Sequence, residues 1–450
     1  MVEEAIIVIN CGSSSVKFAL FSPEFESSVR IARGAVERIG IGAGRFSVLD
    51  GSGATILDET LEVESHADAI DALLDWLQGT QYVPVSVGHR IVHGGEECDC
   101  SLIITSDLED RLSRLIPLAP LHLPHNLTGI KAVKLRCPEL PQVACFDTAF
   151  HHGLPRVAQL TGLPRRFDDD SIRRFGFHGL SYEYVVEQVR RWQGDEAADG
   201  KIVAAHLGNG ASMTAIKGGR SIETSMGFST LAGLPMGTRP GDLDPGAVLY
   251  LLMEKNLTPA ELQHILYRES GLLGRSGLSR NMRDLLAQQD LPEAAEAIEF
   301  FCHHARRHLA AQTASLGGLD RREVQPGCEA VEGLTAPRLG ESHLVRMPPE
   351  HIAAVHDAIG PGRKRGTAEE GPHDVGLERD DKVPATVCEA PKGCTDACDC
   401  CLVVASGDRV LRSGCRDHGR RLIVHIASLP DAGSYRLGHI DRAHRPWARR

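Results

Sequence analysis

Two strand–turn–strand segments of the same design constrain the fold of this chain more than any other feature. In the first, the apolar residues 5–9 and 16–21 flank a turn of Asn, Cys, Gly and Ser; in the second, residues 202–207 and 211–216 flank Gly, Asn and Gly. Turns of small residues and glycine favour tight hairpins. The separation of roughly 200 residues suits a duplicated domain better than a short-period repeat. The chain is therefore predicted to contain two related halves.

Helical and strand-like stretches alternate around these hairpins. Amphipathic stretches at 66–78 and 106–116 predict helices, and short apolar runs at 83–88 and 142–146 predict strands. After the second hairpin the helical pattern dominates, with helices predicted at 244–255, 258–269, 281–289 and 292–316. Strands that alternate with helices are typical of the α/β class, which we predict here.

Composition excludes several classes of protein. No run of about 18 apolar residues occurs, so no membrane-spanning helix is predicted. The net charge is -11, and the acidic excess lies within residues 1–320, which argues against a nucleic-acid partner. No basic segment precedes the first apolar stretch, so we expect no secretory signal and a cytoplasmic location.

The last 130 residues differ from the rest. They contain none of the 12 Phe but 7 of the 13 Cys and 10 of the 24 Pro. Beyond a candidate helix at 347–359 and a candidate strand at 421–428 they show no sustained period. Four cysteines between 394 and 401 invite a metal site, but their spacing is not that of a zinc-finger pair.

The first turn carries groups that suit a polyphosphate. Ser13, Ser15 and Lys17 place hydroxyls and an ammonium group beside successive backbone N–H groups, so donors without bulk lie next to one compact cation. The spacing is not that of a Walker A loop. Either turn alone could be an ordinary hairpin, and Cys11 is expected to be a small filler rather than a nucleophile. Two such turns in matching contexts suggest phosphates held between two facing domains.

Two arginines and three other polar side chains stand at the ends of apolar stretches. Arg90 and Arg239 have glycines nearby, where a guanidinium can project into a cleft and bind a carboxylate or phosphate through two hydrogen bonds. Asp147 follows a buried-looking strand, and ligands of α/β sheets bind at that edge. His122 and His178 are single polar groups in apolar stretches, and each could equally be a satisfied core histidine.

Several of these segments resemble the signatures of a known family, the acetokinase (acetate kinase) family, which belongs with sugar kinases and actin in one superfamily. The matching segments, in chain order, are 9–17 (INCGSSSVK), 146–151 (FDTAFH), 174–179 (RFGFHG), 206–210 (HLGNG) and 224–239. The resemblance runs over about residues 2–320. It implies two duplicated ribonuclease H-like (actin-like ATPase) domains with a cleft between them, 1–149 and 150–320, followed by a divergent tail, 321–450, of uncertain structure.

The resemblance also implies a reaction. It is the reversible transfer of a phosphoryl group between ATP and acetate, giving acetyl phosphate and ADP, with Mg²⁺, or Mn²⁺, as the metal and a homodimer as the assembly. A carboxylate nucleophile is already ionised at neutral pH, so no strong general base is required. The main task is to bring two anions together and neutralise charge on an in-line, metaphosphate-like γ-phosphoryl group.

Roles for individual residues follow from the same resemblance. Asn10 resembles the Mg²⁺-associated residue and Arg90 the anchor of the substrate carboxylate. His178 and Arg239 resemble the stabilisers of the transition state, and Asp147 a proton acceptor or positioning group, of which we favour positioning. The implied substrate pocket consists of Val92, Leu121, His122 and Phe177. The implied ATP contacts are Ser13, Ser15, Lys17, His206, Leu207, Gly208, Asn209, Gly210, Asn281, Met282 and Arg283.

The match departs from the family at three places. Thr230 stands where some members have an apolar pocket residue, which leaves the choice among acetate, propionate and butyrate open. Asn281-Met282-Arg283 lacks the Asp that usually lies two residues before the Arg. After residue 320 the family's adenosine-binding turn and its metal-binding Glu are absent.

The third departure supports a second hypothesis about activity. The tail is typical of a coding sequence read in a shifted frame, the alternative being a genuine divergent extension. Loss of the last part of the second domain predicts little or no kinase activity, so a catalytically impaired acetokinase-like protein stands beside a working enzyme as an expectation.

Overall fold

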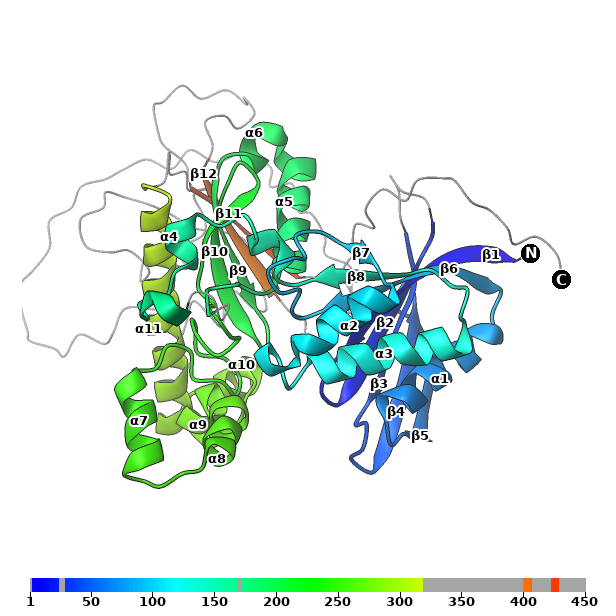
Figure 1. Cartoon of the computed structure of the whole chain (residues 1–450), viewed down its shortest axis with the longest axis horizontal. Helices are drawn as coiled ribbons and strands as arrows, with labels where there is room; N and C mark the ends of the chain where they lie inside the picture. The colour runs from blue at the N-terminus through cyan, green and yellow to red at the C-terminus, as the bar shows by residue number, and fades with distance from the viewer. Residues whose placement is uncertain (1, 24–28, 168–171, 319–399, 407–421, 429–450) are drawn as a thin grey trace, which may run out of the picture.

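The computed structural model describes residues 2–23, 29–167 and 172–318, together with the backbone of two strands at 400–406 and 422–428. Within these ranges the chain forms two β-sheets, each with helices packed against it (Figure 1). The first sheet is built by the N-terminal residues and the second by residues that follow 200 in the chain. The predicted α/β class is confirmed.

The first sheet contains eight strands in the order β5-β4-β3-β2-β1-β6-β8-β7. They are β1 (Glu3–Cys11), β2 (Ser15–Phe21), β3 (Arg30–Glu37), β4 (Ala43–Asp50), β5 (Thr55–Glu62), β6 (Tyr82–Ile91), β7 (Leu102–Ile103) and β8 (Gln142–Phe146). Strands β1 to β5 form an antiparallel meander, whereas β6 runs parallel to β1 and β8 runs parallel to β6. The carboxyl ends of β1, β6 and β8 therefore meet at one edge of the sheet.

Three helices belong to this half: α1 (His66–Gln78), α2 (Ser106–Arg114) and α3 (Leu123–Arg136). Helix α1 begins at a capping box in which the Ser65 side chain accepts from the Asp68 N–H and the Asp68 carboxylate accepts from the Ser65 N–H. Helices α1 and α3 cover one face of the sheet (Figure 1), and Trp76 of α1 packs against Phe18 and Phe46. This apolar core holds the β1–β2 turn in place.

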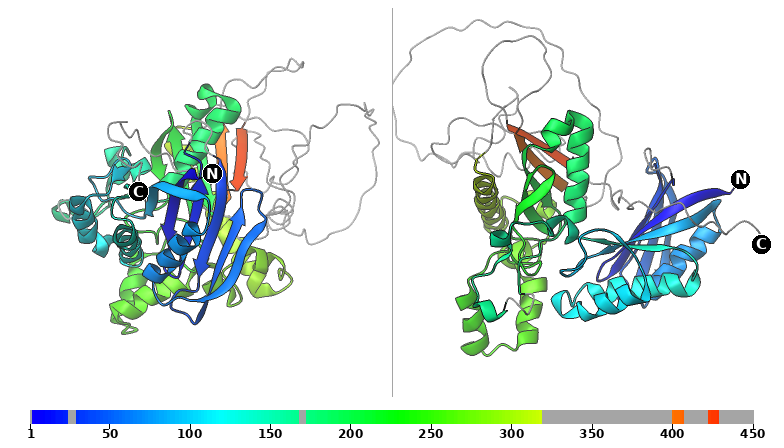
Figure 2. Two further views of the ribbon diagram at one scale, coloured as in Figure 1. Left: turned by 90° about the vertical axis from the view of Figure 1, so that its right-hand side faces the viewer. Right: turned by 45° about the horizontal axis from the view of Figure 1, so that its top comes forward.

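The second sheet contains five strands in the order β11-β10-β9-β12-β13. They are β9 (Lys201–Leu207), β10 (Ala211–Lys217), β11 (Arg220–Thr224), β12 (Cys400–Ser406) and β13 (Leu422–Ser428). Strands β9 to β11 repeat the antiparallel meander of β1 to β3, as the two hairpins predicted. The two sheets differ in the strand that pairs with the other edge of the first meander strand: β12 runs antiparallel to β9, whereas β6 runs parallel to β1. Figure 2 shows β12 and β13, in orange and red, extending the second sheet beyond β9.

The helices after β8 are α4 (Arg156–Gln159), α5 (Gly179–Gln193), α6 (Asp195–Ala198), α7 (Pro245–Met253), α8 (Pro259–His264), α9 (Gly271–Ser276), α10 (Met282–Leu286) and α11 (Pro292–Ser315). Helix α5 packs on the side of the second sheet that carries Ile202 and Ala204, whereas α11 packs near Ala205 and Met213, which point to the other side. Because both faces of this sheet are covered, successive residues of β9 and β10 are buried rather than alternately buried and exposed. No helix in the described ranges has the length and apolar character needed to cross a bilayer.

Element boundaries follow the sequence patterns except where local geometry intervenes. The helix at 66–78 and the strand at 142–146 are confirmed. The helix predicted at 106–116 ends at Arg114, because Pro117 begins a separate 3₁₀ turn, Ile116–Leu118. The helix predicted at 258–269 divides into α8 and a π-helical turn, Ile265–Glu269.

The remaining predicted elements have mixed outcomes. The stretches at 244–255 and 281–289 form shorter helices, and the strand at 421–428 corresponds to β13. The candidate helix at 347–359 lies outside the described residues, as do the side chains of the four cysteines between 394 and 401.

Candidate active site

The shared strand edge of the first sheet brings three predicted site residues together. Asn10 lies near the end of β1, Arg90 near the end of β6, and Asp147 directly after β8. Arg90 donates to the buried Asp147 carboxylate through Nε at 3.0 Å and Nη2 at 2.6 Å, and its Nη1 donates to Asn10 Oδ1 at 3.3 Å. A bidentate pair of this kind fixes the plane of the guanidinium. Asp147 thus orients Arg90 at the edge where ligands of parallel strands bind.

The predicted phosphate turn is closed by a hydrogen bond from the Gly12 N–H to the Ser15 carbonyl at 2.8 Å. Ser13 and Ser15 are half-buried, and Lys17 is the register partner of Asn10 across the hairpin, so the two side chains share one face. Burial raises the pKa of the Cys11 thiol to about 12, so this sulfur stays protonated at neutral pH. Cys11 is therefore a buried filler, as expected from the sequence.

A residue that the sequence analysis did not identify joins this turn to the Arg90 strand. Asn126 of α3 donates through Nδ2 to the Cys11 carbonyl at 3.0 Å, and its Oδ1 accepts from the Val92 N–H at 3.1 Å. Its side chain is only 2% exposed. One buried amide therefore sets the spacing between the ends of β1 and β6. No local sequence pattern distinguishes it, because α3 also carries His125, Thr128 and Lys131.

His178 occupies the residue before α5 in a left-handed conformation, with φ of 64°. Its Nδ1 lies 2.8 Å from Ser212 Oγ, which in turn lies 2.5 Å from the Tyr182 hydroxyl. The ring stacks on His206 with centroids 4.2 Å apart. Burial, with the neighbouring His206, Arg90 and Arg239 charges, holds the pKa of His178 well below 6.5. His178 is therefore a neutral imidazole at neutral pH.

Arg239 lies beside His178 and the second glycine turn. A Cβ on Gly210 would come within 2.5 Å of Arg239 Nη2 and 3.2 Å of His178 Nε2, so a side chain at this position would require one of them to move. The Arg239 Nη1 donates to the Thr230 carbonyl at 2.7 Å. Burial lowers the pKa of Arg239 to about 10, which leaves the guanidinium charged at neutral pH. The turn at 208–210 thus lies next to a half-buried cation and a neutral imidazole.

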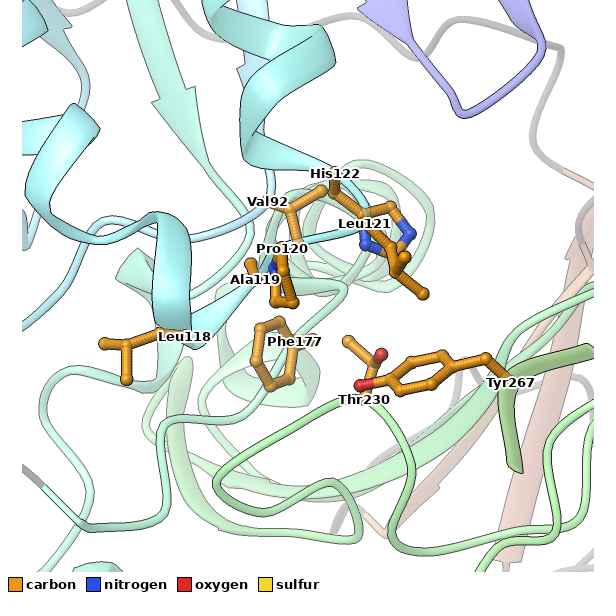
Figure 3. A pocket seen from close by; sticks show the side chains of 9 residues that line it. All are labelled: Val92, Leu118, Ala119, Pro120, Leu121, His122, Phe177, Thr230 and Tyr267. Atoms are coloured by element: carbon orange, nitrogen blue, oxygen red, sulfur yellow. The ribbon is translucent and has the colours of Figure 1, made fainter. Parts of the chain in front are cut away.

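The four predicted pocket residues line one cavity (Figure 3). Val92, Leu121, His122 and Phe177 surround it together with residues 118–120, and the sequence analysis missed Tyr267, which lines it beside Thr230. Burial, assisted by the charges of Arg239 and Arg90, lowers the pKa of His122 to about 3. The pocket is therefore a small, mainly apolar site close to two cationic side chains.

The segment predicted to contact the nucleotide begins α10. Asn281 and Arg283 are exposed and Met282 is half-buried, with the Asn281 amide donating to Asp284 at 3.2 Å. The segment lies beside the second turn, because the Gly237 N–H donates to the Asn209 carbonyl and a Cβ on Gly237 would meet the Arg280 carbonyl at 3.0 Å. The turn at 206–210 and the start of α10 are thus neighbours.

The donor set at the strand edge suits a hard divalent cation. Mg²⁺ prefers oxygen ligands and usually retains waters while sharing one or two protein ligands with substrate phosphates. Asn10 Oδ1 and the Asp147 carboxylate both contact Arg90, and the Ser13 and Ser15 hydroxyls belong to the adjoining turn. Within the described ranges no group of three or more His, Cys, Asp or Glu side chains is placed so that it could hold a metal ion by itself. A cation here would share its coordination with bound phosphates.

Comparison with known proteins identifies close relatives. The model of the acetokinase family matches residues 5–323. The acetate kinase of Rhodopseudomonas palustris is 48% identical over 322 residues, covering 70% of this chain and 80% of the relative, and that of Desulfitobacterium hafniense is 42% identical over 325 residues, covering 70% and 81%. The matched range contains every predicted site residue.

Solved structures similar to this chain include an acetate kinase and a propionate kinase. The Porphyromonas gingivalis acetate kinase superimposes with a TM-score of 0.63 at 33% identity, covering 70% of this chain and 81% of the other. A propionate kinase from Francisella tularensis gives 0.66 at 36% identity, covering 73% and 85%.

Proposed function

The chain belongs to the acetokinase family and is an ATP-dependent phosphotransferase, and from this premise we propose that it transfers the γ-phosphoryl group of ATP reversibly to acetate, giving acetyl phosphate and ADP. The observation that carries the proposal is the position of His122, which lines one small, mainly apolar pocket within reach of the Arg90 and Arg239 charges, with His178 next to Arg239. Such a pocket suits the methyl group of acetate, and the cationic side chains suit two anions that must approach each other.

The carboxylate of acetate would bind to Arg90, with its methyl group against Val92 and Phe177. Because acetate is ionised at neutral pH, its oxygen attacks phosphorus without losing a proton to the protein. Asp147 then acts by orienting Arg90 through their bidentate pair rather than as a proton acceptor.

His178 and Arg239 would act on the phosphoryl group in transit. Charge on its equatorial oxygens is stabilised by donors fixed in place beforehand. Arg239 supplies a half-buried guanidinium, and the neutral His178 supplies an N–H if Nδ1 accepts from Ser212. The buried surroundings strengthen both interactions, because little water competes with them.

ATP would bind through both glycine turns. We propose phosphate contacts from Ser13, Ser15 and Lys17 and from the turn at 206–210, and nucleoside contacts from the segment at 281–283. Asn10 would hold Mg²⁺, or Mn²⁺, beside the phosphates. When bound, the cation neutralises charge on the bridging phosphate oxygens.

We propose two domains, 1–149 and 150–320, that face each other across this site, and a homodimer as the assembly. An exposed apolar helix supports the homodimer: α7 has no buried residue, and its Leu249, Tyr250 and Met253 are more than half exposed. Contiguous exposed apolar side chains of this kind are typical of association surfaces.

The choice of acid is the finer part of the proposal. Acetate is favoured by the acetate kinase relatives, whereas the similarity to a propionate kinase keeps propionate, and with it butyrate, as alternatives. No finding supports the expectation of an impaired enzyme, which depended on residues 321–450.

One assay tests the reaction and the choice of acid. The purified full-length chain is incubated with ATP, Mg²⁺ and acetate, propionate or butyrate, and the acyl phosphate is trapped with hydroxylamine. We expect turnover with acetate and a lower kcat/KM for each longer acid, since one methylene changes binding by about 1–3 kcal/mol. Absence of acyl phosphate with every acid would reject the proposed function.

A further inference from the structure

The small cavity proposed to hold the acid, called here the acyl pocket, has two sides that differ in polarity. Val92, Leu121 and Phe177 present hydrocarbon, whereas Thr230 and Tyr267 lie together on the opposite side with their hydroxyl ends pointing toward one another (Figure 3). Both side chains are half-buried. We call the Thr230 and Tyr267 hydroxyls the polar wall of the pocket.

The polar wall has unused hydrogen-bonding capacity. In the described part of the chain, Thr230 accepts from Arg239 through its backbone carbonyl and Tyr267 accepts from the Thr238 hydroxyl through its backbone carbonyl. Neither side-chain hydroxyl has a hydrogen-bond partner within those ranges. The two groups together offer two donors and lone pairs to whatever enters the pocket.

The backbone contacts also fix where the polar wall stands. Because Arg239 Nη1 holds the Thr230 carbonyl at 2.7 Å, the threonine hydroxyl keeps a set position relative to the guanidinium. Thr238, which holds the Tyr267 carbonyl at 2.8 Å, is the neighbour of Arg239 in the chain. A substrate bound between Arg90 and Arg239 therefore meets both hydroxyls.

Filling this space with a methyl group is unfavourable. A methyl would displace water from both hydroxyls and leave them without partners, which costs free energy. A hydroxyl of the same size could donate to one and accept from the other. Glycolate and propionate provide this comparison, because they have the same number of non-hydrogen atoms and differ by a hydroxyl in place of a methyl.

We propose that the pocket selects short hydroxy acids, with glycolate the simplest, over unsubstituted acids of the same size. This inference rests on the proposed phosphoryl transfer. In the reaction, a carboxylate oxygen of glycolate forms a bond to the γ-phosphorus while the bond from that phosphorus to the bridging oxygen breaks. The electron pair leaves on ADP, and the substrate hydroxyl keeps its proton and is only bound.

The test compares kcat/KM for acetate, glycolate and propionate with the full-length chain. We expect glycolate to exceed propionate by at least about fivefold, the value of one net hydrogen bond. Replacing Thr230→Val removes one hydroxyl at constant size and should reduce the glycolate-to-propionate ratio by about tenfold. Thr230→Ser keeps the hydroxyl and should keep the ratio above one. Tyr267→Phe, which removes the other hydroxyl, should also lower it.

The outcomes separate this inference from the proposed function. Turnover of acetate with propionate preferred over glycolate would overturn the hydroxy-acid inference alone, as would an unchanged ratio in both Thr230→Val and Tyr267→Phe. Absence of turnover with all three acids would overturn the proposed function itself. If a variant fails to fold, the wild-type ratio still decides the question.

Discussion

Ser212 Oγ lies 2.8 Å from Nδ1 of His178, which leaves Nε2 as the ring nitrogen that faces the turn at 208–210. When the Tyr182 hydroxyl donates to Ser212 and Ser212 donates to Nδ1, the neutral ring carries its proton on Nε2. Nε2 is the atom of His178 nearest to the position that a Cβ on Gly210 would occupy. In the proposed reaction, this arrangement would present an N–H donor to the transferring group without a positive charge on the histidine.

Removal of this relay should lower turnover. In Ser212→Ala, Nδ1 loses its partner, so the ring is no longer held in one tautomer. We expect kcat to fall at least about tenfold with KM for ATP and acetate little changed, since the donor acts on the transition state. Ser86→Ala removes another buried serine hydroxyl, far from His178 in the chain, and should retain kcat. Loss of binding with unchanged kcat would argue against an orienting role.

Asp147→Asn tests whether this carboxylate orients Arg90 or accepts a proton. The amide keeps the size but cannot accept both guanidinium hydrogen bonds, so Arg90 becomes less ordered. We expect KM for acetate to rise at least about tenfold, because the carboxylate anchor is displaced. Steady-state kinetics with acetate varied will measure this. A fall in kcat at constant KM would instead indicate a direct part in chemistry.

Asn126 should contribute to the stability of the fold and to the spacing between the ends of β1 and β6, where Asn10 and Arg90 lie. Asn126→Ala leaves the Cys11 carbonyl and the Val92 N–H buried without their partner, which should cost about 3 kcal/mol in the free energy of unfolding. KM for both ATP and acetate should rise. Thr128→Ala, in the same helix, removes a hydroxyl that contacts only the helix backbone and serves as control in urea denaturation. Equal stability of the two variants would contradict the assignment.

The sequence predicted the parts of this site that local patterns reveal. Asp147 was placed at a strand end because residues 142–146 form a short apolar run before it, and α1 was recognisable from its helical period. Both are properties of neighbouring residues.

Contacts between distant residues could not be predicted in this way. Asn126 joins Cys11 across 115 positions, and Ser212 joins His178 across 34, so neither partner is visible in a window of one element. The antiparallel pairing of β12 with β9 likewise depends on strands far apart in the chain. Tertiary packing decides such contacts, and a single sequence does not display it.

Buried histidines should make the protein sensitive to acid. Burial is the main cause that lowers the pKa of five of them: His89, His93 and His151 to about 4, His122 to about 3, and His178 well below 6.5. Above pH 6.5 these groups are neutral in both the folded and unfolded chains. As the pH falls from about 6.5 to about 4, only the unfolded chain binds protons, so the free energy of unfolding should decrease.

Urea denaturation between pH 7.5 and 5 measures this dependence. The double variant His89→Leu/Gln142→Leu removes one such histidine together with its hydrogen-bond partner. Its free energy of unfolding should therefore fall less steeply than that of the wild type as the pH decreases. Stability that stays constant over this range would show that the histidines do not titrate as proposed.

Gly210 should tolerate no side chain. In Gly210→Ala, the new methyl would stand 2.5 Å from Arg239 Nη2 and 3.2 Å from His178 Nε2, so at least one of the two groups must move. Displacing a transition-state donor by about 1 Å can cost about 100-fold in rate, and we expect a loss of this order in kcat. Gly153→Ala adds the same methyl where no atom lies within 4 Å and should leave kcat unchanged. Because the clash involves side-chain ends rather than the core, the temperature of thermal unfolding should be similar in both variants. A normal kcat in Gly210→Ala would refute the close placement of Arg239 and His178 around this turn.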